Sequence, residues 1–216
     1  MRRVLLLLPL LAFGCAGAPP VEERDYDRCW QEARLCLGRV EHPATPKGER
    51  SDWAARALAH ADRASALAPE RVEGHYSRAV ALGRVLEHAT LPPLSKISEL
   101  EAAGQRARAL DPAFNCAGAL RLLALLYFKA PSWPIGPASA GDEELIESLF
   151  EEALRRAPGC PENLIGFAEF LHDQGRNARA LDLAEGAQVA LVDHPGLEAH
   201  ERGELQGRIR RLLDRK

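Results

Sequence analysis

Histidine and cysteine are the residue types that could ligate a metal or act in catalysis, and the chain has seven and five of them. Zinc sites usually place such ligands in pairs two to five residues apart, and no pair in this sequence has that spacing. Residues 200–204 read His-Glu-Arg-Gly-Glu and begin like a zinc-protease helix, but a Glu stands where the second His ligand belongs. We therefore expect no metal ion and no cofactor, and interpret this string as a surface ion-pair pattern.

The sequence also lacks the motifs that position a nucleophile or a phosphate group. It has no G-x-S-x-G elbow and no P-loop, and Cys160 is followed by Pro161 with no base close by in the chain. His172 and Asp173 are adjacent at the expected end of a helix, where we interpret them as a polar tip that contacts a partner. The sequence thus predicts a binding protein and not an enzyme.

Helical repeats are the elements expected to position a binding surface. Three segments end with the same sequence pattern, in which Ala64, Ala107 and Ala153 each precede a Pro by five residues. The second helix of a tetratricopeptide unit ends this way, because the small side chain lets two helices approach closely and the Pro stops the helix. Apolar residues make up 46% of the chain but aromatics only 6%. Ala and Leu, both strong helix formers, supply most of the apolar content.

The resulting prediction is an all-α fold, a tetratricopeptide-like helical-hairpin array of about four pairs with a C-terminal capping helix, in a single domain over residues 25–216. Asp142 is expected to cap a helix, Ser98 to open a capping box with Glu101, and Gly175 to mark a turn. The expected helices are 25–40, 53–67, 71–88, one from 95 or 98 to 110, 118–128, 143–156, two within 162–187, and 197–216.

The first fifteen residues have the pattern of a bacterial lipoprotein signal peptide. Arg2 and Arg3 precede a short apolar run, and the stretch Leu-Ala-Phe-Gly-Cys that ends at Cys15 resembles a lipobox. We expect Sec export, lipidation of Cys15, and a flexible tether over residues 16–24. Ala16 in place of Asp favours the periplasmic face of the outer membrane. An ordinary cleaved signal peptide is the alternative interpretation.

Export would place the remaining cysteines in an oxidising compartment. Cys116 and Cys160 each follow a repeat-ending Pro, in equivalent places of neighbouring units. They could form a disulfide with each other, each could pair with Cys29 or Cys36 of the first helix, or all could be buried free thiols. The formal net charge of −3 does not indicate nucleic-acid binding. The expected contact with a membrane is the lipid alone.

The first helix of each pair should line the concave face of such an array. Aligning the units on their prolines places seven candidate binding residues there, and the strip is apolar in its middle and charged at its rims. That pattern suits a peptide or an apolar ligand, although Leu123 could equally be core. The candidates are Tyr76 and Arg84 from the second unit, Leu123 and Tyr127 from the third, and Glu169, His172 and Asp173 from the fourth.

The C-terminal half resembles the T-component lipoproteins associated with TRAP transporters. The similarity rests on residues 127–136, 150–153, 161–164 and 167–171, which read Tyr-Phe-Lys-Ala-Pro-Ser-Trp-Pro-Ile-Gly, Phe-Glu-Glu-Ala, Pro-Glu-Asn-Leu and Phe-Ala-Glu-Phe-Leu. The resemblance implies a helical-repeat lipoprotein that partners a periplasmic solute-binding protein, forms a homotrimer, and has a channel that admits an apolar ligand.

Trp133, which stands between two prolines, is the candidate binding residue of the loop in that stretch. A Trp held between prolines is rigid, and it would either plug the inside of the array or cap a ligand channel. The alternative function is a generic tetratricopeptide scaffold in envelope assembly, which binds another envelope protein and no small molecule.

Overall fold

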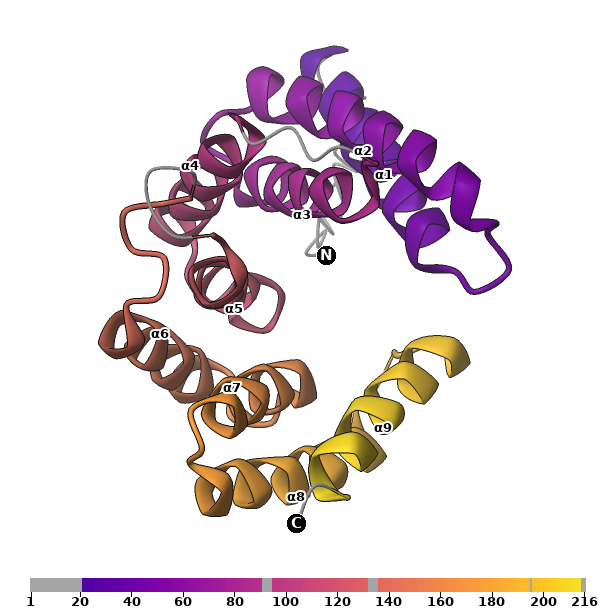
Figure 1. The fold of residues 1–216 in the computed structure, drawn as a ribbon. Helices are drawn as coiled ribbons and strands as arrows, with labels where there is room; N and C mark the ends of the chain where they lie inside the picture. Colours follow the sequence, from indigo (N-terminus) through magenta and orange to yellow (C-terminus); the bar gives the residue numbers. More distant parts are fainter. Residues whose placement is uncertain (1–20, 91–94, 132–135, 195, 215–216) are drawn as a thin grey trace, which may run out of the picture.

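The computed structural model describes residues 21–90, 95–131, 136–194 and 196–214, and those residues form nine α-helices and no β-strand (Figure 1). Cys15 and Trp133 lie outside them. No helix of the described part is long and apolar enough to cross a membrane. The helices are α1 (Val21–Glu41), α2 (Lys47–Leu67), α3 (Val72–His88), α4 (Ser95–Leu110), α5 (Phe114–Lys129), α6 (Glu143–Arg156), α7 (Pro161–Asp173), α8 (Asn177–Asp193) and α9 (Ala199–Leu213).

Consecutive helices pack as antiparallel hairpins, which confirms the predicted array of four pairs with a terminal helix. Figure 1 shows a curved arrangement in which α3, α5 and α7 lie on the inner side and α4, α6 and α8 on the outer side. Helix α9 packs on α7 and α8 through Leu205, Ile209 and Leu212. It therefore covers the open end of the last pair, as a solenoid requires.

The small residues that defined the repeats lie where the helices touch. Ala64, Ala107 and Ala153 are all 0% exposed. At the α2–α3 contact, a Cβ placed on Gly74 would lie only 2.9 Å from the backbone nitrogen of Ser65. The two helices thus meet backbone to backbone beside Ala64, so the sequence pattern correctly located the packing positions.

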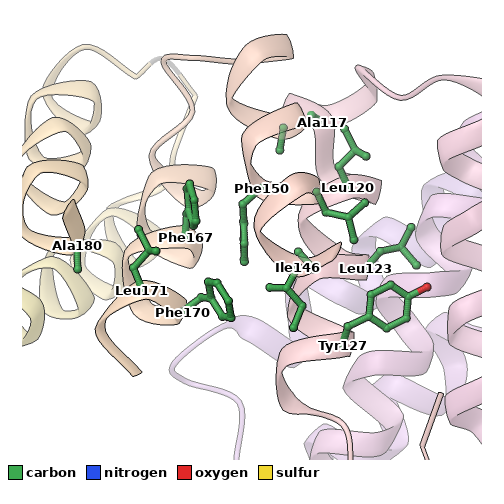
Figure 2. Packing of buried hydrophobic residues seen from close by; sticks show 13 residues of the cluster. Ala117, Leu120, Leu123, Tyr127, Ile146, Phe150, Phe167, Phe170, Leu171 and Ala180 are labelled. Carbon is green, nitrogen blue, oxygen red and sulfur yellow. The ribbon is translucent and has the colours of Figure 1, made fainter. Parts of the chain in front are cut away.

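The largest core cluster lies between α5, α6 and α7, in the second half of the chain (Figure 2). Phe150 of α6 stacks on Phe167 of α7, with ring centroids 5.3 Å apart and planes 11° from parallel. Phe170 lies one turn further along α7 and meets Phe128 of α5 edge to face at 5.4 Å. These rings hold α7 at a fixed place against α5, and α7 in turn carries three of the predicted binding residues, Glu169, His172 and Asp173.

Several predicted boundaries need correction. Helix α1 begins at Val21, inside the stretch expected to be a tether, and α2 begins at Lys47 instead of Trp53. Because α4 starts at Ser95, Ser98 lies within its first turn and its hydroxyl donates to the Ser95 carbonyl, so it opens no capping box. A capping box is instead formed by Glu198 at the start of α9.

Two other local predictions are confirmed. The Asp142 carboxylate accepts a hydrogen bond from the Leu145 amide at 3.0 Å and caps α6. Gly175 has a φ of +73° between α7 and α8, a conformation that strongly favours glycine. Asp142 accepts a backbone hydrogen bond at the start of a helix, and Gly175 turns the backbone at the end of one. Both roles depend only on nearby residues in the chain, so short sequence patterns could identify them.

The start of α5 differs from an ordinary helix. Asn115, Cys116 and Ala117 have φ values of 48°, 57° and 57°, and regular helix begins only after them. Left-handed backbone costs non-glycine residues about 1–2 kcal/mol each. This turn is held by its surroundings, because the Cys116 carbonyl accepts hydrogen bonds from Arg121 (3.4 Å) and from Asn163 of α7 (2.9 Å).

Candidate functional site

A groove lies where the C-terminal ends of α5, α7 and α9 converge. It is partly open to solvent and has a volume of about 280 Å³, and three of the predicted binding residues line it together with side chains from α5 and α9. We name it the α9 groove. Its lining residues are Phe128, Lys129, Glu169, His172, Asp173, Arg208, Arg211 and Leu212.

Part of the charge in the α9 groove is already neutralised. Glu169 accepts two hydrogen bonds from Arg208, at 2.9 and 2.7 Å, which is the bidentate geometry that favours Arg–carboxylate pairs. His172 Nδ1 lies 2.9 Å from Asn177 Oδ1. Lys129 and Arg211 are exposed and form no ion pair with any other described residue. With three basic and two acidic side chains, the groove is net positive when His172 is neutral.

Arg84 lies on the inner helix α3 but belongs to a separate cluster. Its guanidinium donates to Glu41 and Glu87, both at 2.6 Å. Burial alone would lower the pKa of Arg84, but these two carboxylates raise it above its usual value. Burial alone would raise the pKa of Glu87, but the hydrogen bond and charge of Arg84 together have the larger effect and lower that pKa below its usual value. Arg84 therefore ties α3 to the end of α1 and is not free to hold a ligand.

Tyr76 also lies on α3, near the opposite end of that helix. Its hydroxyl accepts a hydrogen bond from Asn115 at 2.9 Å, and its ring meets Phe114 edge to face at 5.5 Å. A Cβ on Gly118 would lie 2.5 Å from the Tyr76 hydroxyl, so the ring fills the space beside the start of α5. The structure places Tyr76 in this α3–α5 contact and outside the α9 groove.

The predicted binding roles of Leu123 and Tyr127 are corrected by the structure. Leu123 is 0% exposed and Tyr127 2% exposed, and both belong to the core cluster of Figure 2. The Tyr127 hydroxyl donates to Glu101 at 2.7 Å, and burial together with this carboxylate raises its pKa to about 12. The physical reason is that α4 and α6 flank α5, so the apolar stripe of α5 packs on its neighbours and leaves no open channel wall.

All four described cysteines are free thiols in the structure. The Cys160 thiol donates to Glu162 at 3.0 Å, and Arg121 approaches its sulfur at 3.7 Å. Burial raises the pKa of Cys160 to about 12 although Arg121 opposes the shift, so the thiol stays protonated and is a poor nucleophile. The Arg121 guanidinium also donates to the Cys116 carbonyl, so Cys116 and Cys160 both lie next to the same guanidinium. A Cys116–Cys160 disulfide stays a prediction.

The described residues contain no group of three or more His, Cys, Asp or Glu side chains that could hold a metal ion. The structure adds three α9 residues that the sequence analysis did not select, namely Arg208, Arg211 and Leu212. Their spacing of three and four residues places them on one helical face, which is a readable signal. No local pattern shows that this helix packs on α7, so the sequence alone does not place these three residues in a groove.

Comparison with known proteins supports the fold. No protein-family model matches the chain, and no curated protein matches it. A solved crystal structure of a thermophilic tetratricopeptide-repeat protein from Thermus thermophilus superimposes with a TM-score of 0.56 at 18% sequence identity. The match covers 89% of this chain and 99% of that one. The chain therefore has a tetratricopeptide-like fold, and at this identity the likeness extends to the fold alone.

Proposed function

We propose that this chain is a lipid-anchored periplasmic protein that docks another envelope protein through the α9 groove. We further propose that the partner is a solute-binding protein of a TRAP-type transporter, on the strength of the motifs in residues 127–171. The single observation that carries the docking proposal is the meeting of Glu169, His172 and Asp173 with unpaired cations and apolar side chains in one groove.

The composition of the α9 groove fits a particular kind of segment. Phe128 and Leu212 supply apolar surface, and Leu212 is only 6% exposed, so it forms part of the floor. Lys129 and Arg211 flank it with unpaired positive charge. A short segment that carries a carboxylate next to an apolar side chain is complementary to this arrangement.

The buried positions of α5 favour a protein partner over a small apolar ligand. An apolar ligand needs an apolar cavity, and Leu123 and Tyr127, the residues expected to line one, are packed in the core. The scaffold function, in which the same groove binds an envelope protein and no small molecule is held, is therefore the second candidate. The two candidates differ only in the identity of the partner.

Reversing the free charges of the α9 groove is the direct test. We expect the double variant Lys129→Glu/Arg211→Glu to bind the purified solute-binding protein of a neighbouring TRAP-type system at least tenfold more weakly, a loss of about 1.4 kcal/mol. Isothermal titration calorimetry of the full chain in detergent micelles measures this. Arg155, an exposed residue of α6, provides the matched control, and Arg155→Glu should bind normally.

Each result has a defined meaning. Equal affinity of the double variant and the parent chain would exclude the α9 groove as the docking surface. Absence of binding by the parent chain itself would exclude the solute-binding protein as partner and leave envelope scaffolding as the function. Native mass spectrometry of the same sample tests the proposed homotrimer, which gives a mass of three chains.

The proposed anchor rests on Cys15 and has its own test. We expect Cys15→Ala to abolish incorporation of labelled palmitate and to release the protein from the membrane fraction, because only a thiol at that position can accept the lipid. Cys116→Ala, which alters another cysteine of the same chain, should remain labelled. Labelled Cys15→Ala protein would contradict the anchor.

A further inference from the structure

The two ends of the helical array meet at a pair of histidines. His42 lies in the connection between α1 and α2, and His200 lies in the first turn of α9. Their ring centroids are 5.1 Å apart, with planes inclined by 59°. Figure 1 shows the start of α9 facing the α1–α2 connection across the opening between the two ends of the curve.

This contact lies between the two ends of the curved array. Within the described residues, α9 packs only on helices α7 and α8, and none of the helices α1 to α6 packs against it. The connection after α1 and the start of α9 approach each other at the His42–His200 pair. A side-chain contact between the two ends of the array can influence whether the ends stay together.

The neighbours of the two rings limit how much positive charge the pair can hold. His42 Nδ1 accepts the Ala44 amide hydrogen at 3.2 Å, which requires that nitrogen to be unprotonated. His200 Nδ1 lies 3.2 Å from the Glu198 carboxylate, which can balance one imidazolium. The other nearby carboxylates are engaged, Glu41 by Arg84 at 2.6 Å and Glu201 by the Glu198 amide at 2.8 Å.

We propose that His42 and His200 form a proton-operated clasp that closes the helical array at neutral pH and releases it in acid. The closed arrangement accommodates a protonated His200 beside a neutral His42. A second proton on His42 breaks its bond from the Ala44 amide and places two like charges in contact. Histidine is the residue type whose charge most readily changes between pH 5 and 8, so this is the range over which the clasp is tested. The clasp is independent of the proposed partner.

Energy transfer between two probes across the closure tests the clasp. Gly48, near the start of α2, and Gly203, in α9, both have open space where a Cβ would lie, so bulky probes fit there. We place two noncanonical amino acids at these positions in the full-length chain and attach a pH-insensitive donor and acceptor. Transfer efficiency should fall as the pH drops from 8 to 5, and His42→Gln/His200→Gln should lose that response.

A matched variant and a second mutation sharpen the outcome. His60→Gln removes a histidine of α2 that lies outside the pair, and it should keep the full response. Glu198→Gln removes the carboxylate that stabilises a protonated His200, so the doubly protonated pair should form, and the clasp should release, at lower pH. A constant transfer efficiency in the parent chain would overturn the proposal. An equal fall in the parent chain and in His42→Gln/His200→Gln would also overturn it, because the fall would then come from general unfolding in acid.

Discussion

We expect Phe150→Ala to lower the free energy of unfolding by about 3–5 kcal/mol, the range found when a buried Phe is truncated. Phe150 is 0% exposed and stacks on Phe167 at 5.3 Å, while Phe170 lies 6.2 Å away. Its ring therefore joins α6 to two turns of α7. Truncation would leave a cavity in the middle of an array whose units support only their neighbours. Urea unfolding followed by circular dichroism at 222 nm measures the loss.

Two further variants show that the effect comes from the packing of this ring. Phe150→Leu keeps most of the apolar volume and should cost less than about 1.5 kcal/mol. Leu35 is 65% exposed on α1, and Leu35→Ala should change the free energy of unfolding by less than about 0.5 kcal/mol. If Phe150→Ala were no more damaging than Leu35→Ala, the α6–α7 packing described here would be wrong.

The second large effect is expected at Asn163, the one Asn in the described residues that is 0% exposed. Its side chain donates to the Cys116 carbonyl at 2.9 Å and accepts from Arg121 at 2.7 Å. Asn163→Ala would leave a half-buried guanidinium without that acceptor and remove the stronger bond to the left-handed turn at 115–117. We expect a loss of about 1–3 kcal/mol in the free energy of unfolding, measured by urea titration.

The control for Asn163 is an exposed residue of the same type. Asn177 begins α8, is exposed, and its side chain hydrogen-bonds among the described residues only with His172, so Asn177→Ala should stay within about 0.5 kcal/mol of the parent chain. Hydrogen exchange at the start of α5 gives a second readout. Faster exchange there in Asn163→Ala, but not in Asn177→Ala, is expected because the turn loses its clamp. Unchanged exchange in both would contradict the assigned role.

The sequence was most informative where a single residue type determines a local packing or capping event. An Ala at a helix crossing and a Pro one turn later reveal a repeat without any knowledge of the partner helix, and Ala64, Ala107 and Ala153 are all fully buried. Asp142 and Gly175 act on their own backbone, so they were also identified correctly. Such signals can be read from the sequence because they depend only on residues that are close together in the chain.

The errors arose where an assignment depended on contacts between distant segments. Aligning the repeat units on their prolines placed Leu123 and Tyr127 on the concave face, but the alignment could not show that α4 and α6 flank that part of α5. The left-handed start of α5 is held by Asn163, 47 residues away from Cys116 in sequence, and no local pattern encodes it. The α9 groove was missed for the same reason, because it exists only after α9 folds back on α7.

Hydrogen exchange of the full chain with and without its protein partner tests the docking claim most directly. The account predicts slower exchange in the partner complex at the C-terminal ends of α5, α7 and α9, around Lys129, His172 and Arg211, with α2 and α4 unchanged. Slower exchange confined to the outer helices, or equal exchange in the free and bound chain at those three helix ends, would contradict it.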